Sequence, residues 1–382
     1  MKQAIYTFLL TIFCTALTGC SNAFLPESRD ITNVQLMRTL ALDPGEEARV
    51  AVTAAGDVQP SDEGGEAQPP TILSWEAPTV FSACLTMQTY GDGYISFGHV
   101  SHCLLNAELP EQVGGYLLDF VERDFEMRMD IDLYAVTEGR AADLLTETAS
   151  GSQSATKRLD SISNDLSLTS QGWPMTLRDF LVDLADNGCA LLPVAALQEE
   201  EGETTIVCDH LCWFREEQLG GELTGEQSRA AAILLGQAKS GAVEATLSDG
   251  SVVGLRITGA TVHWQPQWEG DSLTELTAQV SVTADLAELR GDAAPYEPSV
   301  QEELNQCLAQ ALEEQIQDLM DLCQAENADL IHLRRKMGMQ CPARSGILQE
   351  QWDEWFPQLT LTAQVVATVE RSYDVNRAEV SA

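Results

Sequence analysis

The sequence is poor in basic residues. Its 382 residues include 21 Lys and Arg against 59 Asp and Glu, which gives a formal net charge of −38 at pH 7. Binding to nucleic acid or directly to anionic lipid headgroups requires clustered positive charge. The composition argues against both partners and predicts a well-solvated surface whose charges repel one another. A saline habitat would produce the same acidity.

Long hydrophobic runs are also missing. The longest covers residues 4–17, about 14 residues, whereas a transmembrane helix needs roughly 20. Lys2 precedes it and supplies the positive flank of an export signal. We therefore interpret the run as the apolar part of a signal peptide. No later run approaches 18 apolar residues, so we expect no membrane-spanning segment after it.

The run closes on Leu17-Thr18-Gly19-Cys20, which resembles the lipobox of bacterial lipoproteins. In that motif the Cys thiol accepts a diacylglyceryl group before cleavage between Gly19 and Cys20. Two acyl chains give a stable anchor, whereas one holds only marginally. We predict a signal peptide at 1–19 and a lipid anchor at Cys20, which places the mature chain on the extracytoplasmic face of a membrane. The alternative is a plain secretory signal in which Cys20 occurs by chance.

Catalytic signatures are missing as well. The sequence has no G-x-S-x-G, no H-E-x-x-H, no phosphate-binding lysine loop and no C-x-x-C. The Gly91-Asp92-Gly93 segment lacks the remainder of a dinucleotide fingerprint and is interpreted as a turn. Carboxylates are so abundant that no pair stands out as an acid–base couple. We predict that the chain is not an enzyme, with no catalytic or cofactor-binding residue and no cofactor beyond the lipid on Cys20.

Eight cysteines follow Cys20, and two interpretations of them stay open. One is a set of disulfides, as in many exported proteins. The other, which we favour because the chain is long enough to fold without cross-links, is buried free thiols. The residues concerned are Cys84, Cys103, Cys189, Cys208, Cys212, Cys307, Cys323 and Cys341.

Two short clusters contain residue types that bind zinc. They are His99-x-x-His102-Cys103 and Cys208-x-His210-x-Cys212. Together they could supply four tetrahedral ligands. Neither has the loop spacing of a structural zinc pair, so we expect local packing or capping roles and predict no metal site.

Hydrophobic periodicity predicts an N-terminal α+β domain at 20–198. Two early strands, of which the first could instead be a short helix, are followed by a mobile loop at 56–70, which is rich in Gly, Pro, Asp and Glu. Polar small residues at 146–172 predict a linker-like excursion. The expected elements are strands at 31–42, 49–53 and 131–136, mixed helix and strand at 78–109, and helices at 112–127, 140–145 and 176–185 with Thr176 as N-cap.

The acidic stretch 199–203 predicts a boundary, followed by a small middle region at 199–225 with strands. A C-terminal α+β domain is expected at 226–382. Its longest element is a helix at 299–328, expected to pack across a sheet rather than to project as a coiled-coil arm. The other expected elements are a helix at 226–239 ended by Gly241, strands at 242–247, 252–257, 260–264, 276–286 and 359–369, and a hairpin turn at 248–250.

The predicted fold class is therefore α+β and multi-domain, with about three domains of mixed or antiparallel sheets packed by helices. With these elements in order, several short motifs resemble the Ger(x)C family, the lipoprotein C subunits of nutrient germinant receptors in endospore-forming bacteria. They are Leu40-Ala41-Leu42-Asp43, Phe97-Gly98-His99, the stretch from Leu118 to Val136, Thr176-Leu-Arg-Asp-Phe180, Leu191-Leu-Pro193, Leu234 to Gly241, Ala328-Asp329-Leu330 and Trp352 to Pro357.

The resemblance covers nearly the whole chain. It implies a three-domain lipoprotein on the outer face of the spore inner membrane. It further implies two integral-membrane partner subunits, of A and B type, and a structural or signalling role without catalysis. His332 and Arg334 depart from the pattern, since the family tends to have glycines there. The alternative function is an extracytoplasmic solute-binding lipoprotein of an importer, which would usually have two βαβ lobes.

Overall fold

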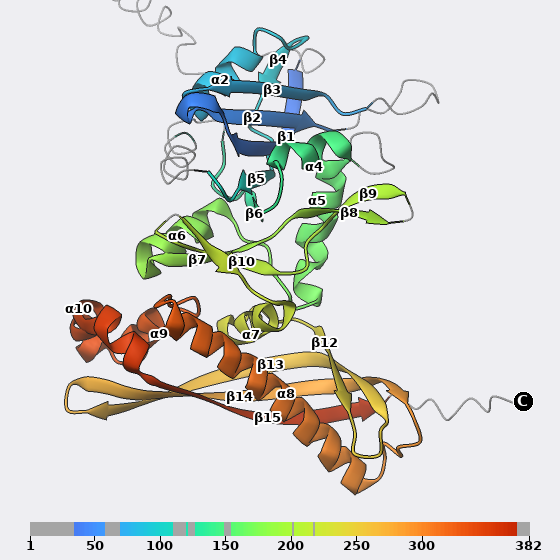
Figure 1. Cartoon of the computed structure of the whole chain (residues 1–382), viewed down its shortest axis with the longest axis vertical. Helices are drawn as coiled ribbons and strands as arrows, with labels where there is room; N and C mark the ends of the chain where they lie inside the picture. Colours follow the sequence, from blue (N-terminus) through green and yellow to red (C-terminus); the bar gives the residue numbers. More distant parts are fainter. Residues whose placement is uncertain are drawn as a thin grey trace, which may run out of the picture.

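The described residues form four sheets, and the three larger ones follow one another along the long axis of the molecule (Figure 1). The computed structural model describes residues 34–57, 69–109, 120, 127–148, 154–200, 202–216 and 218–372. Within these ranges the sheets are mixed or antiparallel and are covered by helices, so the predicted multi-domain α+β fold class is confirmed. The signal segment, Cys20, nearly all of the expected helix at 112–127 and most of the loop at 56–70 lie outside the described residues.

The first sheet has the order β3-β2-β1-β5-β6, and β4 also pairs with β1. The two expected early strands are confirmed as an antiparallel pair. Parallel pairing of β5 with both β1 and β6 gives strands that are buried on both faces, and their sequences are correspondingly apolar. The strands are β1 (Val34–Pro44), β2 (Val50–Gly56), β3 (Ile72–Ala77), β4 (Tyr94–Ser96), β5 (His102–Asn106) and β6 (Asp132–Val136).

Helices cover both faces of this sheet. On one side α2 (Val80–Met87) packs against β2 and β3, and on the other lie α4 (Ala141–Glu147) and α5 (Ala155–Asp165). The polar linker predicted at 146–172 is wrong in its central part, because this part forms α5 and a short 3-10 helix at Leu166–Leu168. Ser154 caps α5 by accepting from the Lys157 amide, and Leu159 and Ile162 are buried against the sheet.

The middle sheet has the order β11-β10-β7, and β8 and β9 form a separate hairpin. The acidic stretch 199–203 lies in this hairpin, which turns at Gly202 with φ +84°. Because β7 pairs with β10, part of the middle region predicted at 199–225 shares a sheet with residues that precede 199. The elements are α6 (Leu177–Asn187), β7 (Cys189–Pro193), β8 (Ala196–Glu200), β9 (Glu203–Val207), β10 (Leu211–Arg215) and β11 (Gln218–Glu222).

Helix α7 (Gly225–Leu235) leads into the last sheet. Thr224 and Gln227 form a capping box at its start, where each side chain accepts from the other residue's backbone amide. The predicted C-cap at Gly241 is wrong, because the helix ends earlier at Gly236, which has φ +73°. Glycine adopts this left-handed conformation without a steric cost. Gly241 instead begins β12 (Gly241–Thr246).

The last sheet has the order β12-β13-β14-β15. The strands predicted at 252–257 and 260–264 are one strand, β13 (Val252–Glu269), with a bulge where the register shifts between Ile257 and Gly259. The hairpin turn at 248–250 is confirmed, with Gly250 at φ +86°. β14 (Ser272–Arg290) pairs antiparallel with β13 and parallel with the final strand, β15 (Thr360–Ser372).

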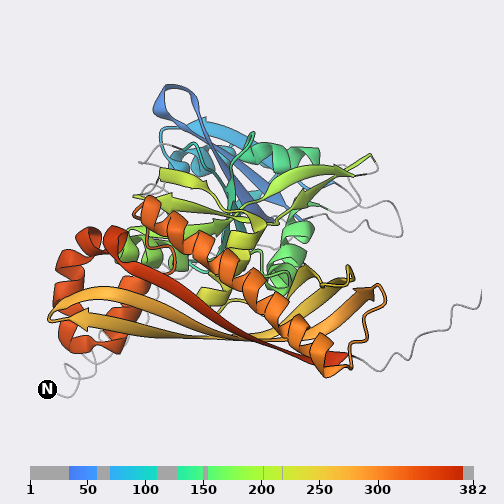
Figure 2. The same cartoon turned by 60° about the horizontal axis from the view of Figure 1, so that its bottom comes forward.

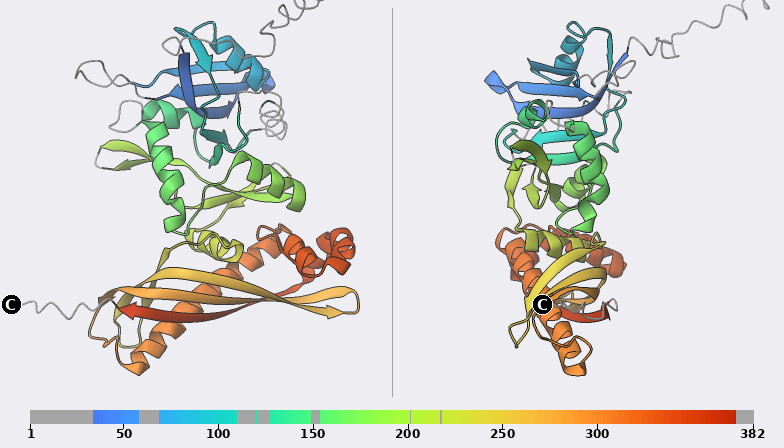
Figure 3. Two further views of the ribbon diagram at one scale, coloured as in Figure 1. Left: turned by 180° about the vertical axis from the view of Figure 1, so that it is seen from behind. Right: turned by 90° about the vertical axis from the view of Figure 1, so that its right-hand side faces the viewer.

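Helix α8 (Pro298–Ala325) runs diagonally across this sheet (Figures 2 and 3). The expected packed helix is confirmed. A full apolar stripe from Leu304 to Cys323 is buried, at about 1.5–3 kcal/mol for each large side chain. Its polar side chains also cover the outer edge of β15, because Asn305 Oδ1 accepts from the Val369 amide at 2.8 Å and Gln301 Nε2 donates to the Val369 carbonyl at 2.6 Å. These bonds satisfy backbone groups that an exposed edge strand would offer to other chains.

Two further helices, α9 (Leu333–Gln340) and α10 (Ser345–Trp355), follow α8 in the chain and precede β15. The sequence did not predict them. Trp352 at the end of α10 stacks on Phe356 at a ring-centroid distance of 5.4 Å. Short 3-10 turns at Pro342–Arg344 and Phe356–Gln358 complete the connection. Over the described ranges, no helix is both long and apolar enough to cross a bilayer.

Candidate functional sites

A partly buried polar network fastens α5 to the first sheet. His102 on β5 is 2% exposed, and its Nε2 lies 2.8 Å from Asp160 Oδ1 on α5. Its Nδ1 lies 3.9 Å from Asp132 Oδ2. One helical turn after Asp160, Ser163 donates to the same Asp132 carboxylate at 2.6 Å, and its Oγ lies 2.5 Å from the Tyr134 hydroxyl. Burial raises the pKa of Tyr134, so this hydroxyl stays protonated.

The hydroxyl groups of this network are not paired with its imidazole. Both ring nitrogens of His102 face carboxylates, and Ser163 is bonded to Asp132 and Tyr134 rather than to the imidazole. Nucleophilic catalysis needs a hydroxyl or thiol within hydrogen-bond reach of the base. The network therefore acts on the position of α5, and its members hold strand and helix in one register.

The network was missed at the sequence level, although a signal was present. Ser154 is a good N-cap, and Leu159, Ile162 and Leu166 follow at helical spacing. The surrounding Ser, Thr and Asp residues obscured that pattern. Of these polar residues, Asp160 and Ser163 find partners on the sheet, whereas Ser161 and Asp165 are exposed.

The two clusters considered for zinc are dispersed. His99 is exposed on the loop before β5, while Cys103 points from β5 into the main core. His102, the neighbour of Cys103, points to the opposite face, as adjacent residues of a strand must. Burial raises the pKa of Cys103 to about 12, which disfavours the thiolate that a metal requires. Among the described residues no group of three or more His, Cys, Asp or Glu is placed to hold a metal ion.

The second cluster is separated in the same way. Cys212 is fully buried in β10, Cys208 packs against the smaller core beneath α5, and His210 lies 2.7 Å from Asp209 and 3.3 Å from Glu222. All eight cysteines after Cys20 are free thiols in the structure. This agrees with the interpretation that most of them are small buried side chains.

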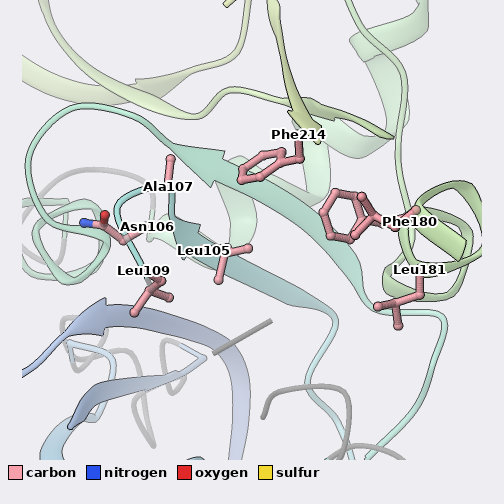
Figure 4. A pocket seen from close by; sticks show the side chains of 8 residues that line it. Leu105, Asn106, Ala107, Leu109, Phe180, Leu181 and Phe214 are labelled. Atoms are coloured by element: carbon pink, nitrogen blue, oxygen red, sulfur yellow. The ribbon is translucent and has the colours of Figure 1, made fainter. Parts of the chain in front are cut away.

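A small apolar pocket lies where β5 ends beside α6 and β10 (Figure 4). Its volume is about 30 Å³, the space of a few atoms. Phe180 and Phe214 meet edge to face at 5.6 Å in its wall, and Asn106 is the polar residue of the lining. The amide of Asn106 is occupied, because Nδ2 donates to Asp43 and to the Gly139 carbonyl, each at 3.0 Å. The pocket is therefore a packing defect rather than a ligand site.

Charged residues bridge the middle and last sheets at the contact of α6 with α9. Asp183 Oδ2 lies 3.6 Å from His332 Nε2, and Asp186 lies 3.7 Å from Arg335. Burial raises the pKa of Asp183 to about 6 and lowers that of His332 to about 4. His332 adopts φ +59°, a conformation in which glycine is the least strained residue.

Lys336 joins the same region to α7. Its Nζ donates to the carbonyls of Leu234 at 3.0 Å and Ile331 at 2.7 Å, and burial lowers its pKa to about 8. Asp329, fully buried, accepts from the amides of Leu333 and Arg334 and so caps α9. The junction is thus held by a set of specific polar contacts.

Two family models and a solved structure match this chain. The family model described as the spore germination protein N-terminal domain matches residues 27–197, and the model described as spore germination B3/GerAC-like, C-terminal matches residues 210–373. The crystal structure of the GerBC protein matches with a TM-score of 0.56 and 17% identity, over 87% of this chain and 97% of that chain. At this identity the match shows a shared fold.

No curated protein matches the sequence. The two family models follow each other in order and together span most of the chain, with their junction between β8 and β10. The resemblance inferred from the short motifs is thereby confirmed, and the chain belongs to the GerAC-like family of spore germination proteins, the C subunits of germinant receptors.

Proposed function

We propose that this chain is the lipid-anchored, non-catalytic subunit of a nutrient germinant receptor. In this proposal Cys20 carries the lipid and holds the protein on the outer face of the spore inner membrane. There it works with two integral-membrane subunits, and its role is structural or in signal transmission. The observation that carries the proposal is the ordered match of both family domains over residues 27–197 and 210–373.

Two properties of the chain support the details. The lipobox-like Leu17-Thr18-Gly19-Cys20 supplies the anchoring residue, and two acyl chains suffice for stable attachment. The polar groups that could do chemistry, His102 and Asp160 above all, are engaged in fastening α5 to the sheet. These contacts favour a role in holding and transmitting a conformation over a role in catalysis.

The anchor is tested by Cys20→Ala, with Cys14→Ala as the matched control. Cys14 lies within the apolar signal run and is removed by cleavage at Gly19, so its substitution should change nothing. Cys20→Ala should move the protein from the membrane to the soluble fraction of spore extracts and slow nutrient-triggered germination. Full activity with the variant still in the membrane would show that partner contacts alone suffice.

The receptor role is tested by deletion and complementation. Spores lacking the gene should fail to germinate in the nutrient that the receptor serves, and the wild-type gene should restore germination. Affinity capture of the lipidated protein from spore membranes should recover two polytopic membrane proteins in stoichiometric amounts. Unchanged germination of the deletion strain, in the absence of a second copy of the gene, would contradict the proposal.

A further inference from the structure

Helix α2 carries large apolar side chains on its outer face. Phe81 and Leu85 lie one helical turn apart and are 53% and 56% exposed, and Tyr90, just after the helix, is 62% exposed. We call these three residues the α2 patch. The other large apolar side chains that are exposed among the described residues are isolated from one another in the sequence. Clustered exposed apolar side chains mark contact surfaces, whereas single ones need no explanation.

The α2 patch is not needed to pack α2 onto its own sheet. The opposite face of the helix fills the core against β2 and β3 with Val80, Ala83, Cys84 and Met87. Tyr90 stacks on Trp75 of β3 at a ring-centroid distance of 4.8 Å, and the Phe81 ring lies 6.3 Å from that of Phe120. These contacts hold the rings in place and leave more than half of each patch residue exposed.

The chain around the α2 patch is almost free of charge. Between Ala77 and Ala107, Asp92 is the only Asp, Glu, Lys or Arg, although 21% of the residues in the protein are charged. An acidic turn lies beside the start of α2 instead, where Glu76 Oε1 accepts from the Glu46 amide at 2.9 Å. The uncharged surface therefore extends from the middle of α2 toward its end. Such a surface can enter an apolar environment without the cost of desolvating charges.

The end of α2 lies beside the start of β1, where the chain from the predicted anchor enters the fold. Val34 in β1 pairs with Tyr94 in β4, the strand that follows α2. Gln88, the C-cap of α2, binds β4 directly, because its Nε2 donates to the Ile95 carbonyl at 2.6 Å and its Oε1 accepts from the Ile95 amide at 3.0 Å. α2 and β4 lie at the end of the molecule that is farthest from the last sheet (Figure 1).

The length of chain before β1 keeps this end of the molecule close to the predicted anchor. Val34 lies fourteen positions after Cys20, and an extended chain spans at most about 3.6 Å per residue, so the reach is at most about 50 Å. A lipid on Cys20 therefore holds the end that carries α2 near the bilayer, whereas the last sheet lies at the far end. The bilayer interface accepts the exposed apolar face of a helix, and aromatic side chains are enriched there.

We propose that the α2 patch enters the bilayer interface and that the protein rests on the membrane through α2. This inference depends on the lipid anchor of the proposed function. The contact centres on Leu85 and Tyr90, since the acidic turn beside the start of α2 stays in water. A single tethered point would leave the orientation of the molecule free. The second contact would fix how its sheets stand relative to the membrane.

Tryptophan quenching by brominated lipid tests the contact. Lipidated full-length protein is reconstituted in phosphatidylcholine vesicles whose acyl chains carry bromine, because neutral headgroups leave the apolar contribution alone. Leu85→Trp and Tyr90→Trp each place a reporter in the α2 patch, and their added emission should be quenched at least about twofold more than that of Val366→Trp. Val366 is the matched control position, since it is 67% exposed on β15 in the last sheet.

A charge placed in the patch should remove the contact without removing the anchor. Adding Leu85→Asp to Tyr90→Trp should lower the quenching of that reporter at least about twofold, because burying an unpaired carboxylate is costly. Val366→Asp in the same background is the control and should leave the quenching unchanged. All of these side chains are exposed, so circular dichroism should show every variant folded.

Flotation of the protein with the vesicles separates the two ways in which the inference can fail. Protein that floats while both reporters are quenched no more than Val366→Trp would overturn the bilayer contact and leave the anchor standing. Wild-type protein that does not float would overturn the anchor and, with it, this contact. In spore membranes a photoreactive side chain at Leu85 should form adducts with lipid. An adduct with protein instead would show that a partner subunit covers the α2 patch, which would also overturn the proposal.

Discussion

The carboxylate of Asp43 caps a helix that begins about a hundred residues later in the chain. It is 1% exposed at the end of β1, where Oδ1 accepts from the Ala141 amide at 2.7 Å and Oδ2 from the Ala142 amide at 2.9 Å. Oδ1 also accepts from Asn106 Nδ2 at 3.0 Å. The local N-cap residue of α4, Arg140, makes no side-chain cap bond. Asp43 therefore provides the cap from another element.

The cost of removing this carboxylate follows from its three donors. Each buried donor that loses its acceptor costs about 1–3 kcal/mol, and a negative charge at a helix N-terminus adds about 0.3–1 kcal/mol. Water entering the space would recover part of this. We expect Asp43→Ala to lower the free energy of unfolding of this module by about 3–5 kcal/mol, and Asp43→Asn by about 1–3 kcal/mol because one acceptor oxygen remains.

Glu147→Gln is the control, since Glu147 is exposed at the other end of α4 and should change stability by less than about 0.5 kcal/mol. Because several sheets unfold in this chain, a single global midpoint is a poor measure. Urea titration should therefore be combined with hydrogen exchange of peptides that cover α4. Asp43→Ala should speed exchange in α4 far more than in α8. Unchanged exchange in α4 would refute the cap.

Four other substitutions test the junction, the middle sheet and α10. Between pH 3.8 and 6 the folded state holds an extra proton on Asp183, whereas between pH 4 and 6.5 the unfolded state holds an extra proton on His332, so their effects oppose each other. Asp183→Asn should leave stability rising with pH across this window, His332→Gln should leave it falling, and equal slopes in urea titrations would contradict the assignment. In β11, a Cβ on Gly220 would lie 1.9 Å from the Trp213 ring, so Gly220→Ala should lower stability by about 1–3 kcal/mol. In α10, a Cβ on Gly346 would meet no atom within 4 Å, so Gly346→Ala should raise stability by about 0.5–1 kcal/mol. Equal midpoints of thermal unfolding for the two glycine variants would contradict this contrast.

Several motif residues that carried the family resemblance have structural roles that the sequence did not reveal. Asp43 caps α4, and Asp329 caps α9. The departure at His332 also has a physical meaning. Its φ of +59° is a conformation in which a glycine, the residue that the resemblance led us to expect there, would be unstrained.

The sequence by itself determined the elements whose signals are local. Strand alternation, the Thr176 cap of α6, the turn at 248–250 and the long amphipathic helix need only neighbouring residues, and the structure has them. The α+β class and the family followed from their order. The lipid anchor at Cys20 also rests on local sequence and remains a prediction, since it lies outside the described residues.

Tertiary structure alone decided the features that join distant segments. A polar stretch forms the packed helix α5 because Asp160 and Ser163 find partners on β5 and β6. No local sequence pattern specifies those partners. The cap on α4 and the dispersal of the cysteines and histidines depend in the same way on strand order. Local periodicity sets which face a side chain takes, but only the folded sheet sets what that face meets.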